Sequence, residues 1–166
     1  MSKLELIRHL YGYNEWANSK LLDAASRVPA EQLLDARVAS WGSLITDLAH
    51  IGGAQAVWLS RWQIGRNPTS VIGVQGMTTL DEVHALFDES HAGLREYVSI
   101  ITEDAVESEL DYSDSRGNQN RRPLWQLMTH VANHGTYHRG EIAGALTSLG
   151  SSPGDLDFVL WELGIR

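Results

Sequence analysis

The feature that most restricts the fold of this chain is the spacing of its apolar residues. From residue 4 to residue 28, an apolar side chain recurs every three or four positions, which is the pattern of one buried helical face. The members of this stripe are Leu6, Leu10, Tyr13, Ala17, Leu21, Ala24 and Val28, and Pro29 ends it. No stretch shows the sustained apolar–polar alternation of a long strand. The sequence therefore predicts an all-α fold.

The second and third predicted helices carry recognisable end signals. The second follows a candidate cap at Ser40 or Ser43 and continues to the "GRNP" segment. The third begins with the capping box "TLDE" at 79–82 and runs to about Thr102. Between these helices, residues 66–78 show no clear period and predict a long loop.

The fourth predicted helix spans roughly residues 123–149. Pro123 suits the first turn of a helix, and Gly150 suits the left-handed position just past its end. Ahead of this helix, "ELDYSDSRGNQNRR" places turn residues between two short arms, which predicts a small β-hairpin. After it, "DLDFVLWELG" predicts one or two helical turns that close the core with Phe158 and Trp161.

Four long helices in 166 residues predict a four-helix bundle, with a small β-hairpin before the last long helix. The hydrophobic fraction of 43% is sufficient for a sizeable core, and no long polar or Pro/Gly-rich tract divides the chain. We therefore expect residues 1–166 to form a single domain.

Charge and composition exclude several classes of function. The formal net charge is −8 and no run of Lys and Arg is present, so nucleic acid is not an expected partner. Charged residues at positions 3, 5 and 8 interrupt the apolar core of a signal peptide, and no window of about 18 apolar residues predicts a membrane span. We expect a cytoplasmic protein with no membrane partner. The chain has no cysteine, so a transition metal would rely on histidine and carboxylate ligands.

Three histidines stand four residues apart in "HVANHGTYHRGE", residues 130–141. At 100° per residue, His134 and His138 lie about 40° apart on the side of the apolar stripe, whereas His130 lies about 80° from His138. An i, i+4 pair brings two imidazoles close enough to bind one ion. A single buried histidine is usually satisfied by neighbouring polar groups, but a buried pair needs more such partners. His134 and His138 are therefore the best candidate pair of metal ligands.

A third ligand has to come from another helix. The candidates are His9, His50, His84 and His91. The helical pattern places His50 at the flank of the second stripe, which permits it as a ligand but does not select it.

Four segments of the chain resemble the DinB family of bundle proteins, which share a superfamily with bacterial low-molecular-weight-thiol transferases. The segments are "YNEWAN" (13–18), "LAHIGGAQAVWL" (48–59), "HVANHGTYHRGE" (130–141) and "DLDFVLWELG" (155–164). They occur in the expected order and extend over nearly the whole sequence, and the block at 130–141 is the most specific of them.

The resemblance implies a four-helix bundle of the DinB/YfiT-like type, commonly a homodimer. It also implies a divalent metal held by one histidine from the second helix and two from the last. On this sequence the implied ligands are His50, His134 and His138. His130 then becomes a near neighbour of the ion rather than a ligand.

Several other residues have two interpretations. Glu141 stands where similar sequences often have Gln; it either acts as a catalytic residue that orients a ligand or moves a proton, or forms a salt bridge with a residue such as Arg139. Asp47 either accepts the ring N–H of a ligand histidine or is solvated. Tyr13 and Trp16 fit either the wall of a pocket or the bundle core.

Three neutral imidazoles leave an open coordination position, which is typical of catalytic rather than closed structural zinc sites. Water at that position would support hydrolysis, and a small thiol would support thiol transfer. We expect a metal-dependent enzyme for a small-molecule substrate, with thiol transfer ahead of hydrolysis. The expected cofactors are a zinc or nickel ion and a low-molecular-weight thiol as cosubstrate. The alternative is a non-enzymatic stress-response module whose ion joins helix two to helix four.

Overall fold

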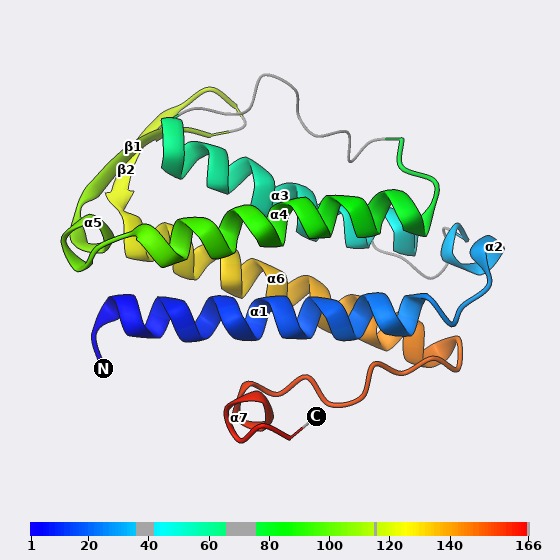
Figure 1. The fold of residues 1–166 in the computed structure, drawn as a ribbon. Coiled ribbons are helices and arrows are strands. Elements are labelled where there is room, and N and C mark those ends of the chain that lie inside the picture. Colours follow the sequence, from blue (N-terminus) through cyan, green and yellow to red (C-terminus); the bar gives the residue numbers. More distant parts are fainter. Residues whose placement is uncertain (36–41, 66–75, 115, 166) are drawn as a thin grey trace.

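Four long helices form the body of the molecule (Figure 1). The computed structural model describes residues 1–35, 42–65, 76–114 and 116–165. The long helices are α1 (Lys3–Ala25), α3 (Leu44–Ile64), α4 (Leu80–Ile100) and α6 (Leu124–Ser148). The shorter elements are α2 (Ala30–Leu33), α5 (Glu103–Glu107), α7 (Phe158–Glu162) and the strands β1 (Glu109–Ser113) and β2 (Gln119–Pro123). The predicted all-α bundle is confirmed.

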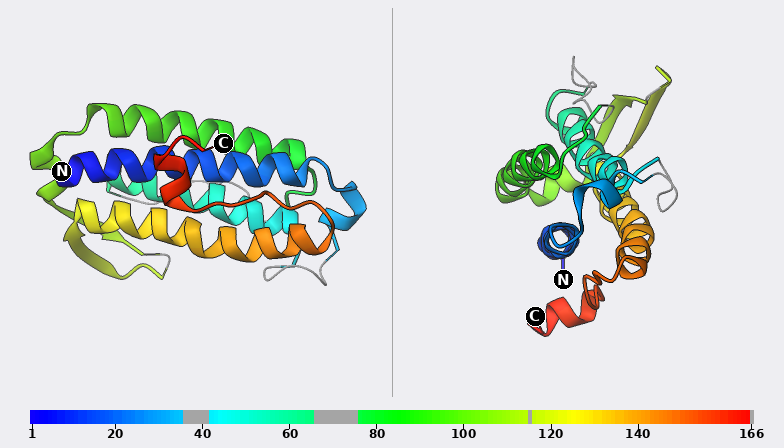
Figure 2. Two further views of the ribbon diagram at one scale, coloured as in Figure 1. Left: turned by 90° about the horizontal axis from the view of Figure 1, so that it is seen from below. Right: turned by 90° about the vertical axis from the view of Figure 1, so that its right-hand side faces the viewer.

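The long helices pack as a four-sided bundle. Helix α1 contacts α6 and α4, and α3 contacts α4 and α6, so that the α3–α6 side lies opposite the α1–α4 side. The end-on view shows the four helices around a common interior (Figure 2). One cluster of buried apolar residues includes Leu48, Phe87 and Ile142. A second cluster includes Tyr11 and Met128.

Local signals in the sequence set most of the helix ends. The Ser43 side chain caps α3 by accepting a hydrogen bond from the Thr46 backbone N–H; the alternative cap, Ser40, lies outside the described residues. Thr79 and Glu82 form the predicted capping box of α4. Gly150 has a φ of 79°, the left-handed conformation predicted just past the last long helix.

The connections differ from prediction in three places. Helix α1 ends at Ala25, three residues before Val28. The third helix, predicted to run to about Thr102, ends at Ile100, and Thr102 caps the separate helix α5, which was not predicted. Pro123 ends β2 and serves as the cap of α6 instead of lying inside its first turn. Of the loop predicted at residues 66–78, residues 66–75 lie outside the described part of the chain.

The predicted hairpin before the last long helix is confirmed. Strands β1 and β2 pair antiparallel, with Glu109 opposite Pro123 and Ser113 opposite Gln119. The Asp114 carboxylate accepts hydrogen bonds from the backbone N–H groups of Arg116 and Asn118, which holds the turn.

The prediction that the C-terminal segment closes the core was wrong. No residue of α7 is buried, and Phe158 is 37% exposed. Instead, α7 covers the outer side of α1, where the rings of Phe158 and Trp161 pack against Tyr13 at centroid distances of 5.2 and 6.3 Å. Gly12 permits this contact, because a Cβ atom there would lie 2.8 Å from the Trp161 ring. Among the described residues, none of the helices is long and apolar enough to cross a bilayer.

Candidate metal centre

Three histidines from two helices meet between α3 and α6. His50 belongs to α3, and His134 and His138 stand one turn apart on α6. The Nε2 atoms of His50 and His134 are 3.1 Å apart. The His138 ring lies at centroid distances of 4.6 Å from His50 and 4.5 Å from His134. One nitrogen from each of the three rings lies within 4.8 Å of the other two, so the group could bind one metal ion.

The two helices hold these rings by ordinary packing. His50 lies in the second turn of α3, close to the Ser43 cap that fixes where this helix begins. The α6 pair follows from the i, i+4 spacing, and α3 packs directly on α6. His138 is buried and the other two rings are half-buried. The group therefore sits at the edge of the core, with its ligands on long helices rather than on loops.

Burial keeps the imidazoles of His50 and His134 in the neutral form that binds metals. It lowers the pKa of His134 to about 4, and electrostatic repulsion from the neighbouring rings, that of His138 first, adds to the effect. Burial also lowers the pKa of His50, with His138 again the next cause. Metal ligation requires unprotonated imidazole nitrogen, so neither ring has to release a proton near neutral pH to bind an ion.

Glu141 fixes the orientation of one ring. Its Oε2 atom is 2.9 Å from Nδ1 of His138, so a proton on Nδ1 is donated to the carboxylate and the lone pair of the ring lies on Nε2. A carboxylate behind a ligating histidine is a frequent arrangement in metal sites. Arg139, the residue that the alternative interpretation paired with Glu141, instead donates to Asn14, Asn18 and Thr136.

The nitrogen separations fit a single transition-metal ion. Two imidazole nitrogens bound at about 2.1 Å stand about 3.0 Å apart at a right angle and about 3.4 Å apart in a tetrahedron. The 3.1 Å between the Nε2 atoms of His50 and His134 lies in this range. The same distance also suits a hydrogen bond between two neutral imidazole rings. The two rings can therefore keep this separation both without an ion and with one bound.

The remaining histidines lie elsewhere. His130 is exposed, 6.0 Å from the His134 ring and 5.3 Å from the Trp58 ring, which agrees with a neighbouring role. His9 pairs with Glu162 of α7, and the ring of His84 lies 3.4 Å from the Ser26 hydroxyl. His91 is buried between α1 and α4. Of the four candidates for a third ligand, only His50 therefore reaches the α6 pair.

Asp47, Tyr13 and Trp16 each had two interpretations from the sequence, and the structure shows where they lie. Asp47 is 3% exposed on α3, so the solvated interpretation of this residue was wrong. Tyr13 is buried on α1 and donates its hydroxyl hydrogen bond to the Leu156 carbonyl. The Trp16 ring lies tilted beside Tyr13, at a centroid distance of 6.0 Å. Tyr13 thus belongs to the packing between α1 and the C-terminal segment, and Trp16 packs next to it.

Sequence reasoning missed an aromatic wall beside the histidine group. The Trp58 ring lies between His130 and Tyr112 of the hairpin, at 5.3 and 5.2 Å. The Arg61 guanidinium lies over the Trp58 ring, 4.4 Å from its centroid, and only 6% of Arg61 is exposed. The i, i+3 spacing of Trp58 and Arg61 is a detectable helix-surface signal. The contact between Tyr112 of the hairpin and Trp58 depends on tertiary packing, which a local sequence pattern does not reveal.

Two comparisons with known proteins bear on this arrangement. A family model described as the DinB family matches residues 1–163. A curated relative named Protein DinB, from Bacillus subtilis (strain 168), is 22% identical over 157 residues, which covers 92% of this chain and 91% of that protein. The match therefore includes all four long helices and the three histidines.

Proposed function

The chain belongs to the DinB family, and from this premise and the three-histidine group we propose that it is a metal-dependent enzyme. The ligands in this proposal are His50, His134 and His138, and the ion is a divalent transition metal, zinc or nickel. The observation that carries the proposal is the convergence of three imidazole nitrogens within 4.8 Å of one another. Three nitrogen ligands leave a coordination position open, as in catalytic zinc sites.

The chemistry of the donors supports this function. A divalent ion held by neutral ligands supplies positive charge that favours the deprotonated form of a bound water or thiol. Glu141 holds the His138 ring through Nδ1 and is the candidate for a residue that also moves a proton. We propose thiol transfer to a small-molecule electrophile ahead of hydrolysis, with a low-molecular-weight thiol as cosubstrate. The chain has no cysteine of its own, so the sulfur would arrive with that cosubstrate.

The second candidate is a non-enzymatic stress-response module in which the ion is structural. It is favoured by the position of the group, because an ion there would join α3 to α6. Turnover with a thiol and an electrophile supports the enzyme. A large loss of thermal stability on chelation, without any turnover, supports the structural module.

Metal content tests the ligand set directly. Protein purified without an affinity tag is expected to hold about one divalent ion per chain by elemental analysis. The His134→Ala and His138→Ala variants are expected to lose it, because each leaves too few ligands. His130→Ala is the matched control, since it removes a histidine from the same helix face outside the ligand set. Wild-type protein that binds no ion, or ligand variants that bind it as well as the wild type, would refute the proposal.

We also propose a homodimer, which the family resemblance implies, and, from the sequence pattern, a single domain per chain and a location in the cytoplasm. Light scattering of the purified protein measures the oligomeric state. A mass equal to one 18.4 kDa chain would contradict the dimer.

A further inference from the structure

A cavity lies between α1 and α4, on the side of the bundle opposite the histidine group. Its volume is about 480 Å³, within the range of small-molecule sites. Leu94 and Val98 contribute apolar wall, and Asn14 and His91 contribute polar groups that are themselves buried. Arg8 and Arg95 also line it. The cavity therefore combines an apolar surface with buried polar atoms and two cations.

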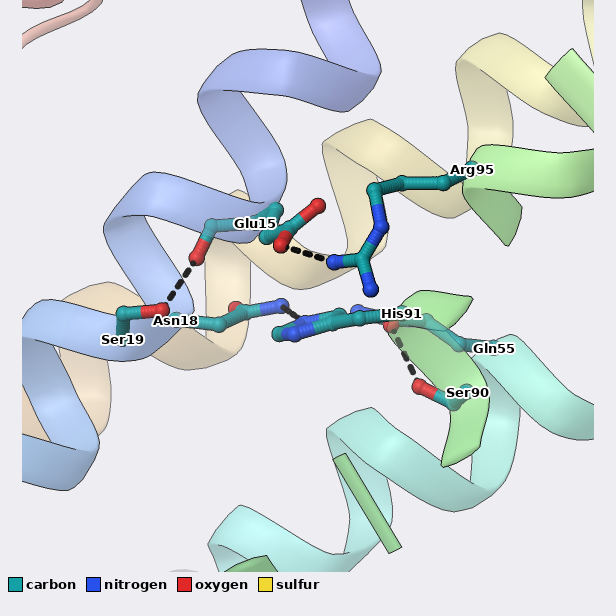
Figure 3. A network of polar contacts seen from close by, with 7 residues as sticks. All are labelled: Glu15, Asn18, Ser19, Gln55, Ser90, His91 and Arg95. Atoms are coloured by element: carbon teal, nitrogen blue, oxygen red, sulfur yellow. Dashed lines mark hydrogen bonds and ion pairs between the residues drawn. The ribbon is translucent and has the colours of Figure 1, made fainter. Parts of the chain in front are cut away.

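A chain of hydrogen bonds fixes the polarity of the buried groups. Arg139 of α6 donates through Nη1 to Oδ1 of Asn14 at 2.6 Å and to Oδ1 of Asn18 at 3.0 Å. A guanidinium has donors only, so the amide oxygens must face it and the amide nitrogens must point elsewhere. The Asn18 amide nitrogen lies 3.2 Å from Nε2 of His91 (Figure 3).

This order of donors determines the tautomer of His91. Because the Asn18 nitrogen donates, Nε2 of His91 accepts, and a neutral His91 then carries its proton on Nδ1. Burial lowers the pKa of His91, which favours this neutral form. Within the described part of the chain, the Nδ1–H group of His91 and the amide N–H₂ of Asn14 have no acceptor. Two hydrogen-bond donors at the cavity are therefore left without partners.

The charges around the cavity are mainly positive. Arg95 forms an ion pair with Glu15, as Figure 3 shows, so these two largely compensate each other. Arg8 adds a second cation to the lining, without an ion pair among the described residues. Arg139, buried behind Asn14, likewise has no carboxylate partner among the described residues. The cavity therefore has a local excess of positive charge, although the chain as a whole has a formal net charge of −8.

We propose that this cavity is a second ligand site that binds a small carboxylate with an apolar tail. The carboxylate accepts hydrogen bonds from Asn14 and His91 and is balanced by Arg8, and the tail packs along Leu94 and Val98. One negative charge is expected, because only Arg8 in the lining is not paired with an acid. This site does not depend on the histidine group, which lies across the bundle between α3 and α6.

Calorimetric titration with octanoate tests the site, with 1-octanol and octylamine as probes of the same chain length. Octanoate is expected to bind more tightly than either, because only it has a carboxylate. The Arg8→Gln variant is expected to weaken octanoate binding by about threefold to fivefold. Arg116→Gln is the matched control, because it removes one cation from the hairpin turn, away from the cavity. It should bind octanoate as the wild type does.

A second variant tests the apolar part of the site. Val98→Phe fills the cavity and is expected to weaken octanoate binding at least tenfold; if it does not fold, the exposed Arg8 position still decides the question. The His134→Ala variant should bind octanoate normally even when it has lost its metal, which separates this proposal from the metal-dependent function. Equal binding of the three probes would overturn the carboxylate site. Octanoate binding that is unchanged in both Arg8→Gln and Val98→Phe would also overturn it, and so would the absence of octanoate binding at millimolar concentration.

Discussion

The contact between Glu141 and His138 determines which ring nitrogen of that histidine carries the lone pair. Its length of 2.9 Å resembles that of a second pair, His9 with Glu162, which lies far from the histidine group at 2.7 Å. The two pairs have the same chemistry in different places, and they therefore form a natural comparison for the effect of a carboxylate on metal affinity.

We predict that Glu141→Gln weakens metal binding by about 10- to 100-fold, because the His138 ring loses its charged partner. Glu162→Gln is expected to leave metal affinity unchanged, since it removes an equivalent contact between α1 and α7. Competition with a chromophoric chelator measures both affinities. Equal affinities for wild type and Glu141→Gln would show that the carboxylate does not support the ligand.

His91 provides a pH-dependent prediction. Burial lowers its pKa in the folded protein, with Glu15 and Asp88 opposing the shift and Arg95 and Arg139 adding to it. The unfolded chain therefore takes up a proton near the ordinary value of 6.5, before the folded chain does. The stability associated with a neutral His91 is complete above that pH and is lost as the pH falls towards the lower folded pKa.

We predict that lowering the pH from 7.5 to 5.5 reduces the unfolding free energy of His91→Gln by less than it reduces that of the wild type. Urea unfolding in the presence of a chelator measures this difference without interference from bound metal. The variant should keep part of the acid sensitivity, because the pKa values of His50 and His134 are lowered as well. His84→Gln controls for the loss of a histidine from α4 outside the cavity. An identical pH dependence in wild type and His91→Gln would contradict the prediction.

At the scale of the element, two helical glycines differ in what surrounds them. A Cβ atom on Gly52 of α3 would lie 2.9 Å from Cγ and Cδ2 of Leu86 on α4. A Cβ atom on Gly144 of α6 would have no neighbour within 4 Å. Gly52 therefore allows α3 and α4 to approach closely, whereas Gly144 has no such packing role.

We predict opposite effects of alanine at these two positions. Gly52→Ala should lower the unfolding free energy by about 1 to 3 kcal/mol, because the buried Leu86 has to move. Gly144→Ala should raise it by about 0.5 to 1 kcal/mol through better helix propensity. Chemical denaturation of the two variants measures both changes. A stabilising Gly52→Ala would mean that the α3–α4 contact can adjust without strain.

The elements predicted from the sequence are those that local signals define. Apolar stripes and end signals together identified all four long helices, and caps such as Ser43 and Thr79 fixed the starts of two of them. The five-residue helix α5 was missed because one turn is too short to show a period. The C-terminal helix was predicted, but its packing on Tyr13 was not, since an apolar ring in a sequence does not reveal which surface it covers.

The candidate site was predictable to a similar extent. The i, i+4 spacing, together with the apolar stripe of the last long helix, identified His134 and His138 as a pair. His50 could be selected only through the family resemblance, because its partnership depends on how α3 packs against α6. The chain from Arg139 through Asn18 to His91 was not predicted, since it joins three helices and only folding reveals it.

At the scale of the whole molecule, two clusters of buried apolar side chains make up the core, and each contains residues of all four long helices. Apolar contacts therefore already join α3 to α6. We therefore predict that chelation leaves the helix content unchanged by circular dichroism and lowers the melting temperature only by the amount that ligand linkage requires. His130→Ala should respond to chelation as the wild type does. Loss of helical structure on chelation would instead identify the ion as a structural joint between α3 and α6.

The separation of His50 from its partners also sets the order of events during synthesis. His50 and His134 are 84 residues apart along the chain. At roughly 5 to 20 residues per second, the ribosome needs on the order of 4 to 17 seconds to add that length. Any ion that requires all three rings must therefore wait until His138 has also been added, which places its acquisition well after the synthesis of α3.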